Sequence, residues 1–320
     1  MPLSEQRSAP GQEPLRYWLM LYIKGMAMGA AEVVPGVSGG TIAFITGIYE
    51  RLLYAIGAFT PALVNVYREK GFSGLWTRVD ATFLLVLLAG MATSVFTVAR
   101  LISFALANYA IFVWAFFFGL IVASVYLVAL EIKNWRINPV LTMIIGTVAG
   151  FIVTQIVPLE PNPGALYIFL GGAVAVCAWI LPGLSGSFIL LLLGLYTTVL
   201  DAINTLDLLL LGSLALGCVL GLVCFSHVLT WMFSRYRDET LGLLVGFMIG
   251  ALAKVWPWKH TLSYQMGHAG EQIPLVQEAV LPYTFQEITG GDPQIALVAA
   301  IGVLGLALVV VLERVTRGDV

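Results

Sequence analysis

The sequence predicts an all-α integral membrane protein made of two inverted-topology repeats, each a re-entrant helical hairpin followed by three transmembrane helices. Two observations carry this prediction. Hydrophobic residues make up 59% of the chain and charged residues only 11%, with a mean hydropathy of +0.93, which is far outside the range of a soluble domain. In addition, a segment of the first half recurs in the second half, which is the signature of an internal repeat.

The repeat is centred on a short motif that the chain contains twice. Pro35–Thr41 reads PGVSGGT, and Pro182–Phe188 reads PGLSGSF. Aligning Glu32–Ile56 with Trp179–Ile203, at an offset of 147, gives 10 identities in 25 positions. Because proline and glycine interrupt apolar helical sequence in both copies, the pair is typical of the broken helices that form transport sites in membrane proteins.

Apolar arms flank each copy of the motif, and they are short. The arms are 17–31 and 41–56 in the first copy and 165–181 and 188–203 in the second. At about 1.5 Å per residue such arms reach ~22–26 Å, which is less than the ~30 Å hydrocarbon core of a bilayer. The lengths therefore predict two re-entrant hairpins, one at residues 17–56 and one at residues 165–203. Two short spanning helices in each segment remain the alternative.

Three long apolar runs follow each predicted hairpin. They are 81–106, 111–130 and 139–157 in the first half and 208–233, 241–255 and 295–312 in the second. A segment at 59–80 mixes aromatic and basic residues and is predicted to lie at the membrane interface. The predicted organisation is a tail at 1–15, repeat 1 at 16–157, repeat 2 at 165–313 with a large loop at 256–292, and a tail at 314–320.

The distribution of charge predicts the orientation. If each repeat crosses the membrane an odd number of times, most of the basic residues fall on one side of the membrane. These residues are Arg7, Arg16, Arg68, Lys70, Arg78, Lys133, Arg136, Arg235, Arg237, Arg314 and Arg317. The loops of the opposite side hold only Lys259, with Lys254 at a helix end. By the positive-inside rule the first side is cytoplasmic, and both termini are expected there.

The two motifs carry the expected chemistry. A proline and a glycine break the helix in each motif, at Pro35 and Gly36 and at Pro182 and Gly183. The next helix therefore begins with unpaired N–H groups and a positive dipole end. Such a helix start with a serine is suited to binding an anion, and phosphate is the obvious candidate. The predicted phosphate-binding residues are Ser38, Gly39, Gly40, Thr41, Ser185, Gly186 and Ser187. Alternatively, each motif only packs the hairpins, with its serine acting as an N-cap.

Charged residues inside apolar segments are the second indication of function, because each costs at least ~2.5–3.5 kcal/mol to insert at the bilayer centre. Lys24, Arg51 and Arg100 are candidate cations for a phosphate. Alternatively, Lys24 and Arg51 extend their charged ends to the interface, and Arg100 has a structural role. Glu32 lies three residues before the first break. It is predicted either to pair with one of these cations or to carry a proton. The second hairpin has Gly171, Trp179 and Thr198 in the corresponding places, so charge is concentrated in the first half.

The two motif segments resemble the double signature of a bacterial membrane family long known only as a domain of unknown function. The first segment is Glu32–Ala43 followed by Gly47–Glu50, and the second is Leu181–Ser187 followed by Gly194–Tyr196. The resemblance extends from Arg16 to about Arg314. The family, of the PopT type, is assigned as polyprenyl-phosphate transporters. Its members are thought to return undecaprenyl phosphate, the lipid carrier of cell-wall precursors, from the outer to the inner leaflet of the plasma membrane.

The resemblance implies a lipid translocase of the bacterial plasma (inner) membrane rather than an enzyme, with undecaprenyl phosphate and the bilayer as partners. Alternating access would bring the phosphate to the two motifs, and Glu32 would couple the step to a proton or hold the cations in place. We expect no cofactor and no metal, because Cys177, Cys218 and Cys224 lie in apolar stretches at spacings that suit no metal site. A small-anion transporter and a polyprenyl-pyrophosphate phosphatase-like enzyme are the alternatives.

Overall fold

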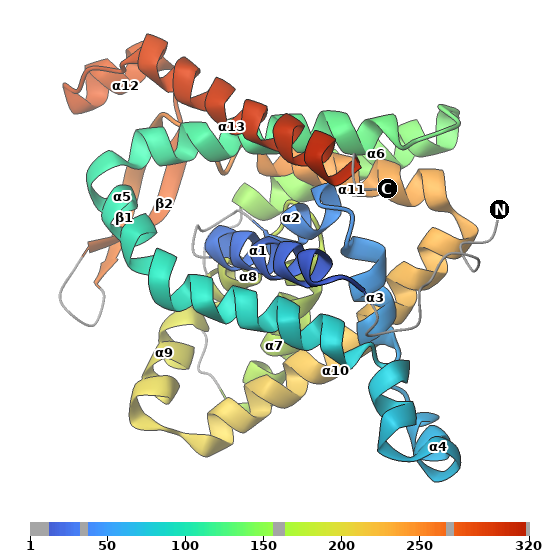
Figure 1. Ribbon diagram of the computed structural model, residues 1–320. Helices are drawn as coiled ribbons and strands as arrows, with labels where there is room; N and C mark the ends of the chain where they lie inside the picture. Colours follow the sequence, from blue (N-terminus) through green and yellow to red (C-terminus); the bar gives the residue numbers. More distant parts are fainter. Residues whose placement is uncertain (1–12, 33–37, 156–163, 267–271, 318–320) are drawn as a thin grey trace.

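The computed structural model describes residues 13–32, 38–155, 164–266 and 272–317, which are mostly helical (Figure 1). The predicted breaks at Pro35 and Gly36 lie outside these ranges. In chain order the elements are α1 (Leu15–Glu32), α2 (Gly39–Ile45), α3 (Tyr49–Gly57), α4 (Leu63–Arg78), α5 (Ala81–Leu130), α6 (Ile137–Gln155), α7 (Ala165–Ile180), α8 (Gly186–Leu192), α9 (Tyr196–Thr205), α10 (Leu208–Arg235), α11 (Arg237–Ala251), β1 (Lys259–Met266), β2 (Gln272–Ala279), α12 (Pro282–Thr289) and α13 (Ile295–Arg317).

Apolar helices long enough to cross a bilayer dominate the described chain. Four helical stretches meet the requirement by length and composition, namely Leu63–Val98, Asn108–Leu130, Ile137–Gln155 and Leu208–Arg235. Two shorter apolar helices lie at Ala165–Ile180 and Ile295–Val311. Many of their large apolar side chains are exposed, as is expected of surfaces that face lipid. The chain is therefore a helical, multi-pass membrane protein.

The two motif segments have matching element boundaries. Helices α2 and α8 cover 39–45 and 186–192, and α3 and α9 begin at 49 and 196, each separated by the repeat offset of 147. The residues that precede the two short helices also match in conformation. Ser38 has φ −115° and ψ 132°, and Ser185 has φ −110° and ψ 129°. Repeated sequence has thus produced repeated local structure.

The second arm of each segment is two helices, where the sequence analysis expected one. Gly47 lies between α2 and α3 with φ +73°, and Gly194 lies between α8 and α9 with φ +67°. This left-handed conformation is one that glycine adopts without the steric cost met by other residues. A helix cannot continue through it, so the chain changes direction at each glycine.

A second pair of breaks separates the long helices. Within α5 the backbone leaves helical geometry at Tyr109 (φ −137°, ψ 36°), and between α10 and α11 it does so at Tyr236 (φ −137°, ψ 55°). The two tyrosines are 127 residues apart, an offset that also relates Gly90 to Gly217. The predicted runs 81–106 and 111–130 are therefore two arms of one kinked helix.

Glycine contacts hold the first helix of each segment against a long helix. Helix α1 packs along the first arm of α5, and α7 packs along α10. A Cβ on Gly25 or Gly90 would come within 2.4 or 2.2 Å of a backbone oxygen of the neighbouring helix. The corresponding glycines Gly172 and Gly217 would come within 2.7 and 2.0 Å. Such small residues let membrane helices approach closely enough for extensive van der Waals contact.

The remaining long helices pack across the two halves. Helix α6 lies along α11, and α13 lies along the second arm of α5. Gly146 and Gly246 face each other in the first pair, and Gly119 lies against Gly302 in the second. Each half therefore contributes a helix to the other, so the halves are interlocked rather than separate domains.

The predicted loop 256–292 contains regular structure that the sequence analysis did not foresee. Strands β1 and β2 pair in an antiparallel hairpin, followed by α12. Trp258 is buried against Ala115 and Val298 and donates its indole N–H to Pro293 O at 2.9 Å. Figure 1 shows this hairpin at one end of the molecule and α4 at the other. We refer below to the hairpin end and the α4 end.

Candidate functional site

The two motifs meet in a contact that we call the motif seam, formed by Glu32 and Ser38–Thr41 on one side and Trp179–Ser185 on the other. Ser38 is fully buried, and its hydroxyl lies 3.1 Å from both Trp179 O and Leu181 O. The same oxygen accepts the N–H of Gly40 at 3.0 Å, so Ser38 caps α2, the role given to it in the alternative interpretation of the motif. The serine therefore links the start of α2 to the end of α7.

A second hydrogen bond crosses the motif seam. The buried hydroxyl of Thr41 accepts the backbone N–H of Gly183 at 3.0 Å. Gly183 has φ +90°, and a Cβ placed on it would lie 2.8 Å from Met248 Cα. Only glycine fits this conformation and this space without displacing backbone. The second motif thus brings its chain against both the first motif and α11.

Glu32 binds the start of the short helix α2. Its Oε1 accepts the N–H of Gly39 at 2.6 Å, and the Trp179 side chain also donates a hydrogen bond to this carboxylate. A carboxylate at a helix N-terminus is favoured by the unpaired N–H groups and by the helix dipole. The position that the sequence analysis assigned to a phosphate is therefore held here by the protein's own carboxyl group.

The start of α8 in the second motif is arranged differently from the start of α2 in the first. Ser185 bonds to Ser187 through their hydroxyl groups at 2.9 Å, and no side chain caps α8 among the described residues. Pro182, Gly183 and Gly186 are buried with Ser185, whereas Ser187 is half-buried. The hydrogen bonds thus bring Ser38 and Thr41 of the first motif against the second motif, inside the motif seam, whereas Ser185 and Ser187 bond to each other.

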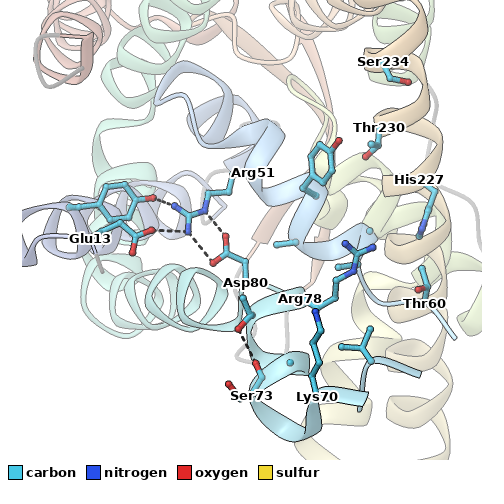
Figure 2. Close-up of a pocket in the computed structure, with 18 of the residues that line it drawn as sticks. Glu13, Arg51, Thr60, Lys70, Ser73, Arg78, Asp80, His227, Thr230 and Ser234 are labelled. Atoms are coloured by element: carbon cyan, nitrogen blue, oxygen red, sulfur yellow. Dashed lines mark hydrogen bonds and ion pairs between the residues drawn. The ribbon is translucent and has the colours of Figure 1, made fainter. Parts of the chain in front are cut away.

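A large cavity opens at the α4 end, apart from the motif seam. Its volume is ≈ 1590 Å³, and its walls come from α1, α3, α4 and α10. Figure 2 shows Arg51 and Asp80 on one side, His227, Thr230 and Ser234 along α10 on the other, and Lys70 and Arg78 between them. Five Arg or Lys side chains and three Asp or Glu side chains line it, a formal balance of 5 − 3 = +2. The cavity is therefore suited to an anionic group.

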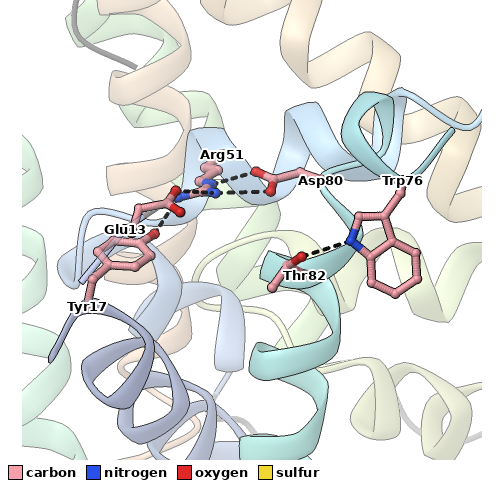
Figure 3. Close-up of polar contacts among 6 residues, drawn as sticks. All are labelled: Glu13, Tyr17, Arg51, Trp76, Asp80 and Thr82. Atoms are coloured by element: carbon pink, nitrogen blue, oxygen red, sulfur yellow. Dashed lines mark hydrogen bonds and ion pairs between the residues drawn. The ribbon is translucent and has the colours of Figure 1, made fainter. Parts of the chain in front are cut away.

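Arg51 is the best-anchored cation of the cavity. Its guanidinium binds Asp80 through two bonds of 2.6 and 3.0 Å, lies 3.4 Å from Glu13, and donates to the Tyr17 hydroxyl (Figure 3). It also stacks 4.7 Å above the Phe83 ring. Planar, bidentate contacts of this kind are how arginine recognises carboxylate and phosphate. In this conformation two carboxylates hold the group that a phosphate would need.

The other predicted cations have different surroundings. Lys24 lines the cavity and donates to Thr46 O at 2.8 Å, at the C-terminal end of α2. Arg100 lies in α5, and its side chain falls outside the described residues. Of the predicted cations, the structure therefore places Lys24 and Arg51 in one cavity. Glu32 has bonds to the motif seam, not to these two cations, among the hydrogen bonds and ion pairs of the described residues.

Several cavity residues were missed as site candidates by the sequence analysis. Arg16, Lys70 and Arg78 were used only to orient the protein, and Glu13 and Asp80 were not considered. A signal did exist, because basic residues in the interfacial segment 59–80 stand close in sequence to the repeat motif. What the sequence does not reveal is that α4 lines the same cavity as α1, α3 and α10.

Comparisons with known proteins show the family of the chain. Residues 28–273 match the VCA0040-like family, whose description is undecaprenyl phosphate translocase-like. The chain is 45% identical over 297 residues to a polyprenyl-phosphate transporter of Vibrio cholerae serotype O1, covering 93% of this chain and 96% of that protein. It is 30% identical over 263 residues to a polyprenyl-phosphate transporter of Staphylococcus aureus, covering 75% and 86%. No solved structure matches. The chain belongs to the undecaprenyl phosphate translocase-like family.

Proposed function

We propose that this protein is a polyprenyl phosphate transporter that returns undecaprenyl phosphate from the outer to the inner leaflet of the plasma membrane. The cationic cavity at the α4 end is the observation that carries the proposal. It joins positive side chains to exposed aromatic residues, Tyr54 and Trp231, in one lining. A lipid phosphate needs both, because its head is an anion and its isoprenoid tail stays in contact with apolar surface.

The size of the cavity favours a lipid over a small soluble anion. Pockets for whole drug-sized ligands are about 300–1,000 Å³, and a single phosphate needs far less. A volume of ≈ 1590 Å³ is therefore excessive for an inorganic anion and adequate for a phosphate with the first units of its tail. The relatives named polyprenyl-phosphate transporters point to the same substrate class.

The cavity would face the cytoplasm. The basic residues Arg68, Lys70 and Arg78 belong to α4, whereas Lys259 begins β1 and Lys254 lines a small space with it. The positive-inside rule then makes the α4 end cytoplasmic, with both termini on that side. In this orientation the present conformation would be the inward-facing one, from which the phosphate leaves to the inner leaflet.

Two inverted repeats would supply the alternating movement. Three features support this symmetry. Helices α2 and α8 have matching boundaries, and α3 and α9 have matching starts. The long helices break at Tyr109 and Tyr236, and α6 and α13 each pack on the opposite half. In transporters of this kind one repeat moves against the other around a central site. The motif seam is closed here. We propose that it opens in the outward-facing state and exposes Ser38–Thr41 and Ser185–Ser187 to the phosphate.

Glu32 would take part in that opening. As a carboxylate it holds Gly39 N–H at the start of α2, the position where an incoming phosphate would bind. Protonation would weaken this hydrogen bond, because a neutral carboxyl group is a poorer acceptor than a carboxylate, and displacement by the phosphate would release the N–H. The glutamate would therefore either couple transport to a proton or keep the helix start satisfied while no substrate is bound.

The hydrogen bonds of the serines favour transport over phosphatase chemistry. A serine nucleophile needs a general base within hydrogen-bond reach. In the part of the chain that the structure describes, Ser38 donates to backbone carbonyls and Ser185 bonds only to Ser187. Neither arrangement would activate a hydroxyl.

Transport of labelled polyprenyl phosphate in proteoliposomes tests the function. The wild-type protein should move the lipid phosphate between leaflets faster than protein-free liposomes do, and should not move undecaprenol. Glu32→Gln should slow transport several-fold while folding normally, because glutamine keeps an oxygen to accept Gly39 N–H but cannot carry the charge. Wild-type protein with no more activity than empty liposomes would refute the function. A wild-type rate for Glu32→Gln would refute only the role of the glutamate.

A further inference from the structure

A lysine at the hairpin end has its charged group turned inward. Lys259 begins β1, and its stem is partly exposed. Its ammonium nitrogen is nevertheless buried and has no hydrogen-bond partner among the described residues. Lysines at membrane interfaces usually do the reverse, since they bury the stem and leave the ammonium in water. The inverted arrangement therefore needs an explanation beyond packing.

A second lysine shares the same small cavity. Lys254 follows α11, and both lysines line a space of ≈ 30 Å³ together with Thr154, Gln155 and Gln277. Its ammonium lies 4.4 Å from the centre of the Phe188 ring, and that of Lys259 lies 3.2 Å from the centre of the Trp114 ring. Phe188 is the last residue of the second motif. The pair of lysines is thus placed between the hairpin end and the start of α8.

Contact with aromatic rings does not replace a hydrogen-bonded counter-ion. A ring face attracts an ammonium group, but it accepts none of its three N–H bonds as an anion would. Neither lysine makes an ion pair with a carboxylate among the described residues. Burial, reinforced by the neighbouring charge of Lys254, holds the pKa of Lys259 well below its usual range. Two like charges in one apolar setting are costly unless an anion joins them.

We propose that Lys254 and Lys259 form an anion-binding site for a phosphate group at the hairpin end. The ammonium groups would supply the charge, and the amides of Gln155 and Gln277 and the hydroxyl of Thr154 line the same space and offer further donors. A volume of ≈ 30 Å³ accommodates about two water-sized groups. Two oxygens of a phosphate would therefore enter, with the remaining oxygens pointing outward. A phosphate monoester headgroup and free phosphate share this chemistry.

The site is separate from the cationic cavity, which lies at the α4 end. Its place in transport rests on the proposed function. If the hairpin end is external, these lysines would be the first charges that a lipid phosphate meets in the outer leaflet, next to the start of α8. Anion binding itself does not depend on the direction of transport or on transport at all.

Equilibrium binding of radiolabelled inorganic phosphate to the purified full-length protein tests the site. Wild type should bind phosphate. Lys259→Met and Lys254→Met should each lower the affinity for the phosphate bound at this site about tenfold or more, since each removes a charge-assisted contact. Lys133→Met is the matched control, because this lysine is exposed and does not line the space that holds Lys254 and Lys259, and it should bind like wild type. Without phosphate, Lys259→Met should melt at a higher temperature than wild type, which separates lost binding from lost folding.

Competition identifies the source of the phosphate. Displacement of the Lys259-dependent phosphate by polyprenyl phosphate, but not by undecaprenol, would assign the site to the lipid headgroup. Displacement by neither would assign it to free phosphate. Binding by Lys259→Met and Lys254→Met that superimposes on wild type would overturn the proposal. Because this experiment requires no transport, its failure is distinct from failure of the proposed function, which the proteoliposome measurement decides with wild-type protein.

Discussion

Replacing Arg51 by methionine is expected to raise the half-saturating concentration of polyprenyl phosphate for transport by about 10- to 100-fold. A hydrogen bond to a charged group contributes about 1.5–3 kcal/mol, and each 1.4 kcal/mol is a factor of ten in binding. Arg51 is the cavity cation with bidentate geometry already in place, on Asp80. It is therefore the side chain whose loss should weaken the grip on a phosphate most.

Asp80→Asn breaks the same ion pair and should have the opposite effect. The carboxylate competes with phosphate for the guanidinium, so its removal should lower the half-saturating concentration several-fold. Asparagine suits the site because Asp80 has φ +50°, a left-handed conformation that asparagine tolerates. If both variants weakened transport equally, the Arg51 cluster would only tie α1, α3 and α5 together, and its role in binding the substrate would be refuted.

Replacing Gly183 by alanine is expected to destabilise the folded protein by about 3 kcal/mol or more. The left-handed conformation alone costs an alanine about 1–2 kcal/mol. The added methyl group would also lie 2.8 Å from Met248 Cα and 2.9 Å from Met248 N, and such overpacking against backbone typically costs another 1–3 kcal/mol. Thermal unfolding in detergent should show a melting temperature several degrees below that of the wild type.

Gly47→Ala separates the two contributions. Gly47 has φ +73°, close to the same backbone region, but a Cβ there meets nothing within 4 Å. It should therefore show the conformational cost alone and melt between wild type and Gly183→Ala. Equal melting temperatures for the two alanine variants would mean that the contact between the second motif and α11 is loose, contrary to the close packing described for the motif seam.

Much of the local structure followed from the repeat, because the same residues at the same spacing make the same local choices. The serine before each short helix and the start of each following helix recur at the offset of 147, and Ser38 caps α2, as the alternative interpretation of the motif expected. The break at Gly47 and Gly194 was missed, although both glycines are among the repeated identities. Helical periodicity in an apolar stretch gives no sign of a single left-handed residue.

The site was harder to predict, since it depends on contacts between distant residues. Lys24 and Arg51 were expected to be near a phosphate, and both line the cationic cavity. That Asp80 neutralises Arg51, and that Glu32 turns to Gly39 N–H rather than to a cation, depends on how α1, α3 and α5 meet. The β-hairpin was missed for another reason. Its alternation of polar and apolar residues is short and follows a helix in a long polar segment.

Both ends of the molecule and the motif seam between the halves fit one transport route. Lys254 and Lys259 would receive a phosphate at the hairpin end, and the cationic cavity would hold it at the α4 end. Between them, Ser38 and Thr41 hydrogen-bond to backbone groups of Leu181 and Gly183, and these bonds would close the path in the present conformation. Movement of the phosphate then requires that these bonds break, which a protonated Glu32 would favour.

The central claim is that the cationic cavity holds the phosphate of the lipid, and the density of a bound polyprenyl phosphate tests it most directly. A structure determined by electron cryomicroscopy with the lipid phosphate present should place the phosphorus among Lys24, Arg51 and Arg78, with the isoprenoid tail leaving past Tyr54 and Trp231. A lipid phosphate bound in this conformation only outside that cavity, with Arg51 still held by Asp80, would contradict the account.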